Sequence, residues 1–209
     1  MRLLDIHTHN NDSENCSSIL CKEEYLDDRN ISIGIHPWNI GCDWQERFAT
    51  IKNCAGKSNV CAIGECGIDK LKSPADIKLQ QEVFKAHAQL AEELKKPLII
   101  HCVKGFDEMI TIRKEFSPKQ AWIIHGFRGK PQQAEQLIKS GFYISFGEKF
   151  NIESLKATPI ERLFIESDES KADIQDIYCR IAEIKGYNVS ELALAIMQNA
   201  IKSNLLPHN

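Results

Sequence analysis

Six side chains that could bind a metal ion or move a proton stand at, or directly after, short apolar segments that the sequence predicts to be β-strands. They are His7, His9, Glu65, His101, His125 and Asp168. If these strands are parallel, their carboxyl ends open onto one face, and residues far apart in the chain converge there. The positions therefore predict one shared site.

The spacing of the first two histidines also fits metal coordination. Residues i and i+2 of a strand point to the same side, so His7 and His9 can hold one cation. Imidazole and carboxylate together suit Zn²⁺, Mn²⁺ or Fe²⁺, and carboxylates extend the range to Mg²⁺. Two cations about 3.5–4 Å apart can activate a water and stabilise the leaving oxygen of a phosphodiester. Glu65, on a central strand, is the natural bridge between them.

Some residues have a simpler interpretation. His87 lies on the apolar stripe of a predicted helix, and we interpret it as a hydrogen-bonded core residue. His36 precedes a Pro-Trp pair and is either part of a turn or part of the site. Asp168 alone would equally suit a helix cap. Cys66 and Cys102 each follow a proposed ligand, and strand alternation turns them away from it, which predicts packing roles.

The hydrophobic pattern predicts the scaffold that would position these residues. Apolar segments rich in β-branched residues occur at 3–6, 31–35, 60–63, 98–101, 122–125, 142–146 and 163–166. Helical patterns separate them, which indicates a parallel α/β sheet covered on both faces. Seven strands favour a distorted, shortened (β/α)8 TIM-type barrel with one strand/helix unit reduced, and a doubly wound open sheet is the alternative. Residues 19–21 are expected as the remnant of the eighth strand, after a polar loop at 10–18.

Cap residues locate several helices. A Ser-Pro pair at 73–74 predicts a helix start, and the apolar stripe of that helix consists of Leu79, Val83, Leu90 and Leu94. Pro131 opens another helix, and Gly141 lies just past its end. Residues 173–185 and 190–203 are predicted to form two closing helices.

Length and composition indicate one globular domain, which we take to span residues 1–209. Apolar residues make up 43% and charged residues 26% of the chain. The net charge of −3 is too mild to attract nucleic acid, so any DNA contact needs a local basic patch or a metal site. No segment approaches the about 20 apolar residues that cross a bilayer, and the start lacks a signal-peptide pattern. Eight cysteines without a C-x-x-C pair are expected to be reduced thiols in the cytoplasm.

Seven segments, in order along the chain, resemble the TatD family of metal-dependent deoxyribonucleases in the amidohydrolase-like barrel superfamily. Residues 5–9 (DIHTH) resemble its opening D-x-H-x-H, residues 34–37 (GIHP) its G-[LI]-H-P, and residues 62–69 (AIGECGID) its I-G-E-x-G-L-D. Four further family motifs are matched by residues 81–101, which end in PLIIH, 124–129 (IHGFRG), 141–147 (GFYISFG) and 163–168 (LFIESD).

The resemblance implies a distorted barrel with a dinuclear metal centre and a metal-activated water that hydrolyses DNA phosphodiester bonds, often as an exonuclease. One cation would be held by His7, His9, Glu65 and Asp168, and the second by Glu65, His101 and His125. Asp168 would also orient or deprotonate the water, so Asp168 and Glu65 are the catalytic candidates. Mg²⁺ is commonly assigned in the family, whereas the ligand types suggest a softer ion, so Mg²⁺, Mn²⁺ and Zn²⁺ stay open.

The chain departs from the family in segments that face the substrate. The stretch over residues 9–34 is shorter, Val103 replaces the arginine of an H-x-R motif, and residues 169–170 replace an A-P pair. These differences affect which substrate binds more than they affect the hydrolytic chemistry. The expected substrate is single-stranded DNA or its 3′ ends. We assign substrate binding to His36, Lys104 and Arg128, with Lys130 as a further phosphate contact.

Two other hypotheses compete with a deoxyribonuclease. A shortened mouth would suit a barrel metallohydrolase of a small phosphoester, amide or lactone. A binding module that kept its metals but lost turnover is the third hypothesis, and the intact set of six ligands argues against it. The sequence leaves the oligomeric state open.

Overall fold

Eight parallel strands form one sheet in the order in which they occur along the chain. The computed structural model describes residues 2–10, 16–26 and 29–206. The strands are β1 (Leu3–Thr8), β2 (Cys16–Lys22), β3 (Ile31–Ile33), β4 (Val60–Asp69), β5 (Leu98–Val103), β6 (Trp122–Ile124), β7 (Tyr143–Phe146) and β8 (Leu163–Ile165). Thr8 forms a parallel bridge with Asp168, just past β8, so the sheet curls into a nearly closed barrel. The barrel prediction is confirmed, and the open-sheet alternative is wrong.

Strand β2 is more complete than the sequence suggested. We expected residues 19–21 to be a remnant, but Cys16–Lys22 form a full strand that pairs with both β1 and β3. The predicted polar loop at 10–18 is therefore wrong for its last three residues, and its residues 11–15 lie outside the described part. Polar residues form this strand because its neighbours satisfy the backbone hydrogen bonds. What the barrel lacks here is helices and not a strand, because the described residues between β1 and β3 contain no helix.

The other seven predicted strands are confirmed, and β4 continues six residues beyond its predicted end at residue 63. Two glycines allow this extension because β5 passes very close. A Cβ atom on Gly64 (φ +135°) would lie 2.3 Å from the Ile99 carbonyl oxygen, and one on Gly67 (φ +154°) would lie 1.9 Å from that of His101. The close approach carries Glu65 up to the carboxyl end of the sheet.

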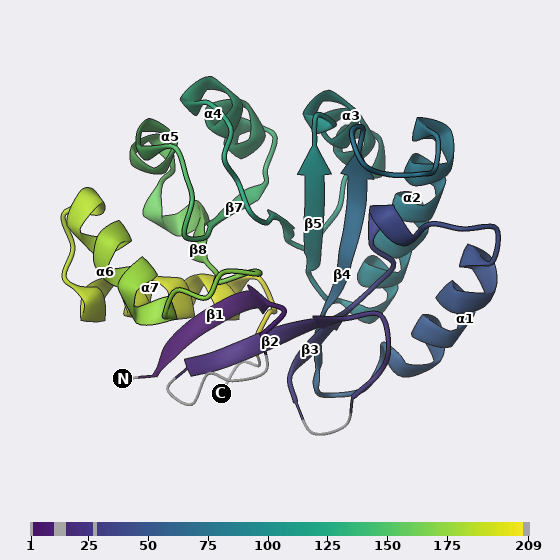
Figure 1. Cartoon of the computed structure of the whole chain (residues 1–209), viewed down its shortest axis with the longest axis horizontal. Helices are drawn as coiled ribbons and strands as arrows, with labels where there is room; N and C mark the ends of the chain where they lie inside the picture. Colours follow the sequence, from purple (N-terminus) through teal and green to yellow (C-terminus); the bar gives the residue numbers. More distant parts are fainter. Residues whose placement is uncertain (1, 11–15, 27–28, 207–209) are drawn as a thin grey trace.

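Helices follow β3 and each later strand and lie outside the sheet (Figure 1). They are α1 (Trp44–Cys54), α2 (Ile77–Leu94), α3 (Phe106–Phe116), α4 (Pro131–Lys139), α5 (Ile152–Ala157), α6 (Ile174–Lys185) and α7 (Val189–Lys202), with 3-10 turns η1 (Pro37–Asn39) and η2 (Ile160–Arg162). The start of α4 at Pro131, Gly141 beyond its end, and the two closing helices are confirmed.

The predicted start of α2 is wrong by three residues. The Ser73 hydroxyl donates to the Pro37 carbonyl and so ties this loop to η1. Asp76 caps the helix instead, and its carboxylate accepts from the Leu79 amide at 2.9 Å. The predicted stripe of α2 does face the core: Val83 and Leu90 are buried, and its two end residues pack against them.

The core fills the space between the helices and the sheet. A single cluster of buried apolar residues extends from Leu3 to Leu205. Aromatic rings pack within it: Trp122 lies 5.1 Å from Phe84 and 5.9 Å from Phe142, measured between ring centroids. Within the described ranges, the helices are too short or too polar for any of them to span a bilayer.

Candidate metal centre

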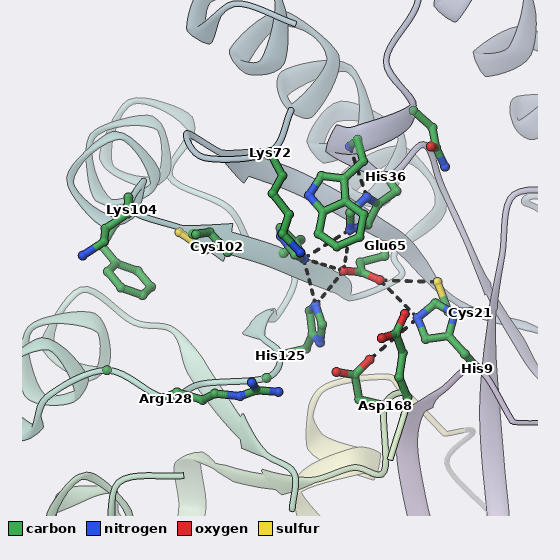
Figure 2. A pocket seen from close by; sticks show the side chains of 18 of the residues that line it. His9, Cys21, His36, Glu65, Lys72, Cys102, Lys104, His125, Arg128 and Asp168 are labelled. Carbon is green, nitrogen blue, oxygen red and sulfur yellow. Dashed lines mark hydrogen bonds and ion pairs between the residues drawn. The ribbon is translucent and has the colours of Figure 1, made fainter. Parts of the chain in front are cut away.

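The carboxyl ends of five strands bring the six predicted ligands together. His7 lies within β1, Glu65 within β4 and His101 within β5. Of the other three, His9 and His125 directly follow β1 and β6, and Asp168 lies three residues past the end of β8. Figure 2 shows His9, His125 and Asp168 around the Glu65 carboxylate, so strands distant in sequence build one cluster.

One oxygen of Glu65 faces three imidazoles. Its Oε1 lies 2.6 Å from His125 Nε2, 2.8 Å from His101 Nδ1 and 3.1 Å from His36 Nε2. His36, which we assigned to substrate binding, therefore belongs to the cluster. The other ring nitrogen of His36, Nδ1, accepts from the Trp38 amide, and this contact caps the start of η1. His36 therefore also has the turn role that the sequence left open.

The second oxygen of Glu65 faces the histidines of β1. Its Oε2 lies 3.3 Å from His7 Nε2 and 3.6 Å from His9 Nε2. Asp168 Oδ1 lies 3.7 Å from each of the same two nitrogens. The Cys21 thiol on β2 also approaches this oxygen of Glu65, at 3.7 Å. The two carboxylate oxygens of Glu65 are thus shared between two groups of donors.

The charges in this cluster are strongly coupled. Burial raises the pKa of Glu65, but the positive charge of His125 and hydrogen bonds from the imidazoles around Oε1 outweigh it and hold that pKa well below its usual range. Burial opposes protonation of His125, yet Glu65 and Glu166 together hold its pKa well above the ordinary value. The site is built to keep a carboxylate ionised among nitrogen donors.

Carboxylates lie behind two of the imidazoles. The Nδ1 atom of His125 lies 3.5 Å from Glu166 Oε1, an oxygen that also accepts from the Gly126 amide. The Nε2 atom of His101 lies 3.2 Å from Asp69 Oδ2, which accepts from the Trp38 indole at 2.6 Å. Such carboxylate–imidazole pairs are typical behind metal-binding histidines, because they fix the ring and raise its basicity.

Asp5 fixes the end of β8 against β1. Its carboxylate accepts from the Ser167 hydroxyl at 2.6 Å and from the Ser167 amide at 3.0 Å. Burial raises the pKa of Asp5 to about 7. Beside this contact the backbone closes the barrel, since the Asp168 amide donates to the His7 carbonyl and the His9 amide donates to the Asp168 carbonyl. Asp168 is therefore held opposite the β1 histidines.

The donor set fits divalent cations. His7 is fully buried, and neither of its ring nitrogens has a hydrogen-bond partner among the described residues. A buried polar atom without a partner is costly, and a bound cation would satisfy it. Three groups of donors have their ligand atoms within 4.8 Å of one another: His7, His9, Cys21 and Glu65; His7, His125 and Asp168; and His36, Glu65 and His101.

A cavity of about 890 Å³ opens above the cluster. Lys104 and Arg128, which we assigned to substrate binding, are exposed and line it together with Lys72. The Lys72 ammonium lies 4.4 Å from the ring centroid of Trp38. Lys130, by contrast, precedes α4 and is not among the residues that line this cavity.

The two cysteines next to ligands differ. Cys66 is fully buried in the core, and its predicted packing role is confirmed. Cys102 packs against the core but also lines the cavity, so the prediction that it turns away from the site is only half right. Its strand ends there, and the chain turns at Lys104, which has a φ of +57°.

Five residues of the site were not predicted from the sequence: Cys21, Trp38, Lys72, Asp69 and Glu166. The last two stand within segments that resemble family motifs, and this was the available signal. The other three depend on the register of β2 and on the paths of two loops, for which the sequence gives no pattern.

The sequence of this chain matches a known family and several curated proteins. The family model described as TatD related DNase matches residues 3–203. A protein of Buchnera aphidicola (Baizongia pistaciae), named as an uncharacterized metal-dependent hydrolase, is 32% identical over 198 residues, which cover 85% of this chain and 74% of that protein. The 3′-5′ ssDNA/RNA exonuclease TatD of Erwinia tasmaniensis is 31% identical over 146 residues, 65% of this chain and 56% of its own.

The fold has a close counterpart among solved structures. The crystal structure of YJJV, a TatD homologue of Escherichia coli, superposes with a TM-score of 0.82 over 99% of both chains, at 18% sequence identity. Nearly the whole chain matches the family model, and the fold has the same architecture. The chain therefore belongs to the TatD family of metal-dependent hydrolases.

Proposed function

We propose that this protein is a deoxyribonuclease that hydrolyses phosphodiester bonds and removes nucleotides from the end of single-stranded DNA, with two divalent cations at the Glu65 cluster. One observation carries the proposal: the two oxygens of Glu65 face two separate groups of nitrogen donors. This arrangement suits a carboxylate that bridges two cations. The Erwinia relatives named as ssDNA/RNA exonucleases support a nucleic-acid substrate.

The residues would divide between the two cations as the donor groups suggest. The first position takes its donors from His7, His9, Glu65 and Asp168 and the second from Glu65, His101 and His125, with His36 beside it. Divalent cations in such a site lower the pKa of water and neutralise charge that develops on phosphoryl oxygens. Glu166 and Asp69 hold His125 and His101 in the orientations that the site needs.

Asp168 is the proton acceptor in this proposal. Its carboxylate lies at the barrel mouth, and its side chain is 24% exposed, whereas His7 beneath it is fully buried. It can therefore reach a water that enters from the cavity. By taking a proton from that water as the water attacks phosphorus, Asp168 would act as a general base.

The positively charged side chains on the cavity wall would hold the phosphate backbone of the substrate. Lys72, Lys104 and Arg128 surround the opening, in a protein with a net charge of −3. Local positive charge of this kind attracts phosphates without selecting bases, and salt weakens it. The half-exposed ring of Trp38 offers a flat apolar surface on which a base can stack.

A nuclease assay with matched controls tests the proposal. Purified protein is incubated with single-stranded oligonucleotides labelled at either end, with Mg²⁺, Mn²⁺ or Zn²⁺ or with a chelator. We expect metal-dependent release of mononucleotides, and at least a 10³-fold lower rate for Glu65→Gln, because an amide cannot bridge two cations as a carboxylate does. Glu153→Gln, on the surface of α5, is the control and should keep the wild-type rate.

A panel of phosphomonoesters, lactones and amides separates the alternatives. Turnover of one of these without nucleotide release would replace the nuclease by a small-substrate hydrolase. Protein that binds metal but turns over neither class would contradict the hydrolase proposal itself.

A further inference from the structure

The thiol of Cys21 lies at the edge of the cluster that faces β1. Cys21 is a free cysteine in β2, paired in register with Ser32 of β3, and only 9% of it is exposed. Its Sγ lies 3.7 Å from Glu65 Oε2, and Figure 2 shows it next to His9 and Glu65. The six ligands inferred from the sequence do not include it.

The distances around Glu65 Oε2 match those of one tetrahedral cation. Typical zinc bonds are about 2.0–2.1 Å to nitrogen, about 2.1 Å to oxygen and about 2.3 Å to sulfur, so tetrahedral angles place oxygen about 3.4 Å from nitrogen and about 3.6 Å from sulfur. Oε2 lies 3.3 Å from His7 Nε2, 3.6 Å from His9 Nε2 and 3.7 Å from Cys21 Sγ. Each ligand atom of this group lies within 4.8 Å of the other three.

An independent observation also points to a ligand here. His7 is completely buried, and both of its ring nitrogens lack hydrogen-bond partners among the residues that the structure describes. A hydrogen-bonded core histidine such as His87 has both nitrogens satisfied. The Nε2 atom of His7 thus lies within 4.8 Å of the Cys21 thiol and has no hydrogen bond there to any described residue, although it faces Glu65 Oε2.

We propose that Cys21 is a metal ligand: its thiolate joins His7, His9 and Glu65 around the first cation, with the Asp168 carboxylate as a further donor beside them, and makes this position selective for a thiophilic ion such as Zn²⁺ over Mg²⁺. On binding, a sulfur–metal bond replaces the S–H bond and the proton passes to solvent. Thiolate favours Zn²⁺, whereas Mg²⁺ prefers oxygen donors. This inference rests on the metal centre of the proposed function and adds the class of ion that it takes.

Cobalt substitution tests the sulfur bond directly. The metal-free full-length protein is titrated anaerobically with Co²⁺, and the absorption spectrum is recorded. We expect visible d–d bands that report binding and, in addition, a near-ultraviolet thiolate-to-cobalt charge-transfer band. Cys21→Ser should lose only the near-ultraviolet band, whereas Cys102→Ser, which removes another thiol from the cavity wall, should keep both.

Metal affinities provide a second readout. Zn²⁺ affinity should fall at least about tenfold in Cys21→Ser, while Mg²⁺ affinity should change by less than about threefold. X-ray absorption at the zinc edge of the wild-type protein should detect one sulfur neighbour at about 2.3 Å, and this measurement needs no variant to fold.

The outcomes separate this inference from the proposed function. Cobalt binding without a charge-transfer band, or a zinc spectrum without sulfur, would overturn the role of Cys21 and leave the metal centre standing. Failure of the wild-type protein to bind any divalent cation would overturn the metal centre, and this inference with it.

Discussion

At the scale of residues, the cluster owes its properties to one carboxylate surrounded by imidazoles. Nitrogen atoms of five histidines lie between 2.6 and 3.6 Å from the two oxygens of Glu65. The positive charge of His125 and hydrogen bonds from His101, His125 and His36 keep the pKa of this buried group low, although burial alone would raise it. Asp168 is more exposed and stands farther from the imidazoles, which suits a group that exchanges protons with water.

Replacing Asp168 separates proton transfer from metal binding. Asp168→Asn should lower the rate of phosphodiester hydrolysis by about 10²–10⁴-fold, because an amide cannot take the proton of the attacking water. The cation content, measured by elemental analysis, should stay close to that of the wild type, because imidazoles and Glu65 supply the other donors.

Asp176→Asn, an exposed substitution in the first turn of α6, is the matched control. An Asp168→Asn variant that keeps the wild-type rate would remove Asp168 from the reaction.

At the scale of elements, helix α2 supports the loop that carries His36. The ring of His87, on α2, is completely buried, and its Nε2 accepts from the Ile35 amide at 3.0 Å. Its Nδ1 donates to the Val83 carbonyl at 2.7 Å. The imidazole is therefore neutral, and burial lowers its pKa to about 4 from an ordinary value of 6.5. Through Ile35, this helix holds His36 beside Glu65.

The buried imidazole makes the fold sensitive to acid. Above pH 6.5, His87 is neutral in both the folded and unfolded states, so it adds no pH dependence. Between pH 6.5 and 4 the unfolded chain binds the proton first, so the free energy of unfolding falls as the pH falls. From the two pKa values, 6.5 and about 4, the loss at pH 4 is about 3 kcal/mol.

Urea unfolding of the wild type and of His87→Gln at pH 7 and pH 4 measures this term. Gln offers a donor and an acceptor but does not titrate, so the variant should lose about 3 kcal/mol less than the wild type over this range. Equal losses in the two proteins would contradict a neutral, buried His87.

At the scale of the whole molecule, the barrel holds the donors on separate strands. β1, β4 and β5 supply His7, Glu65 and His101, and His9, His125 and Asp168 follow β1, β6 and β8. The strands are joined side by side by hydrogen bonds, but the seam between β1 and β8 has only a single bridge. A cation held by His7, Glu65 and Asp168 would link the two sides of this seam.

Metal binding should therefore stabilise the fold. Metal at 100 times its dissociation constant adds about 2.7 kcal/mol to the free energy of unfolding, which for a chain of this size raises Tm by about 5–10 °C. Thermal unfolding monitored by circular dichroism, with Zn²⁺ or with a chelator, measures the shift.

Glu65→Gln should show less than half of the wild-type shift, because it lacks the carboxylate between the two donor groups. Identical Tm values for loaded and chelated wild-type protein, with bound metal verified by elemental analysis, would argue against a cation that joins these strands.

Much of the scaffold could be predicted from local patterns. Buried parallel strands are continuous apolar segments, so seven of them were visible in the sequence; Pro131 and Gly141 marked α4, and the two closing helices were also predicted. The six proposed ligands could be predicted for the same reason: each stands at or near a strand end, and parallel strands end on one face. The resemblance to the TatD family was readable from the same segments and is confirmed by the family match.

Contacts between distant segments could not be predicted in this way. The sequence of β2 is too polar to mark it as a strand, and only pairing with β1 and β3 makes it one. That pairing is also what brings Cys21 to Glu65. The place of His36 depends on the loop that α2 supports, and His125 faces Glu166, which follows β8. Sequence by itself determined which residue types stand at the strand ends, because periodicity and burial are local. Tertiary structure alone decided which of them touch, because register and loop path arise from pairing and packing between segments that lie far apart along the chain.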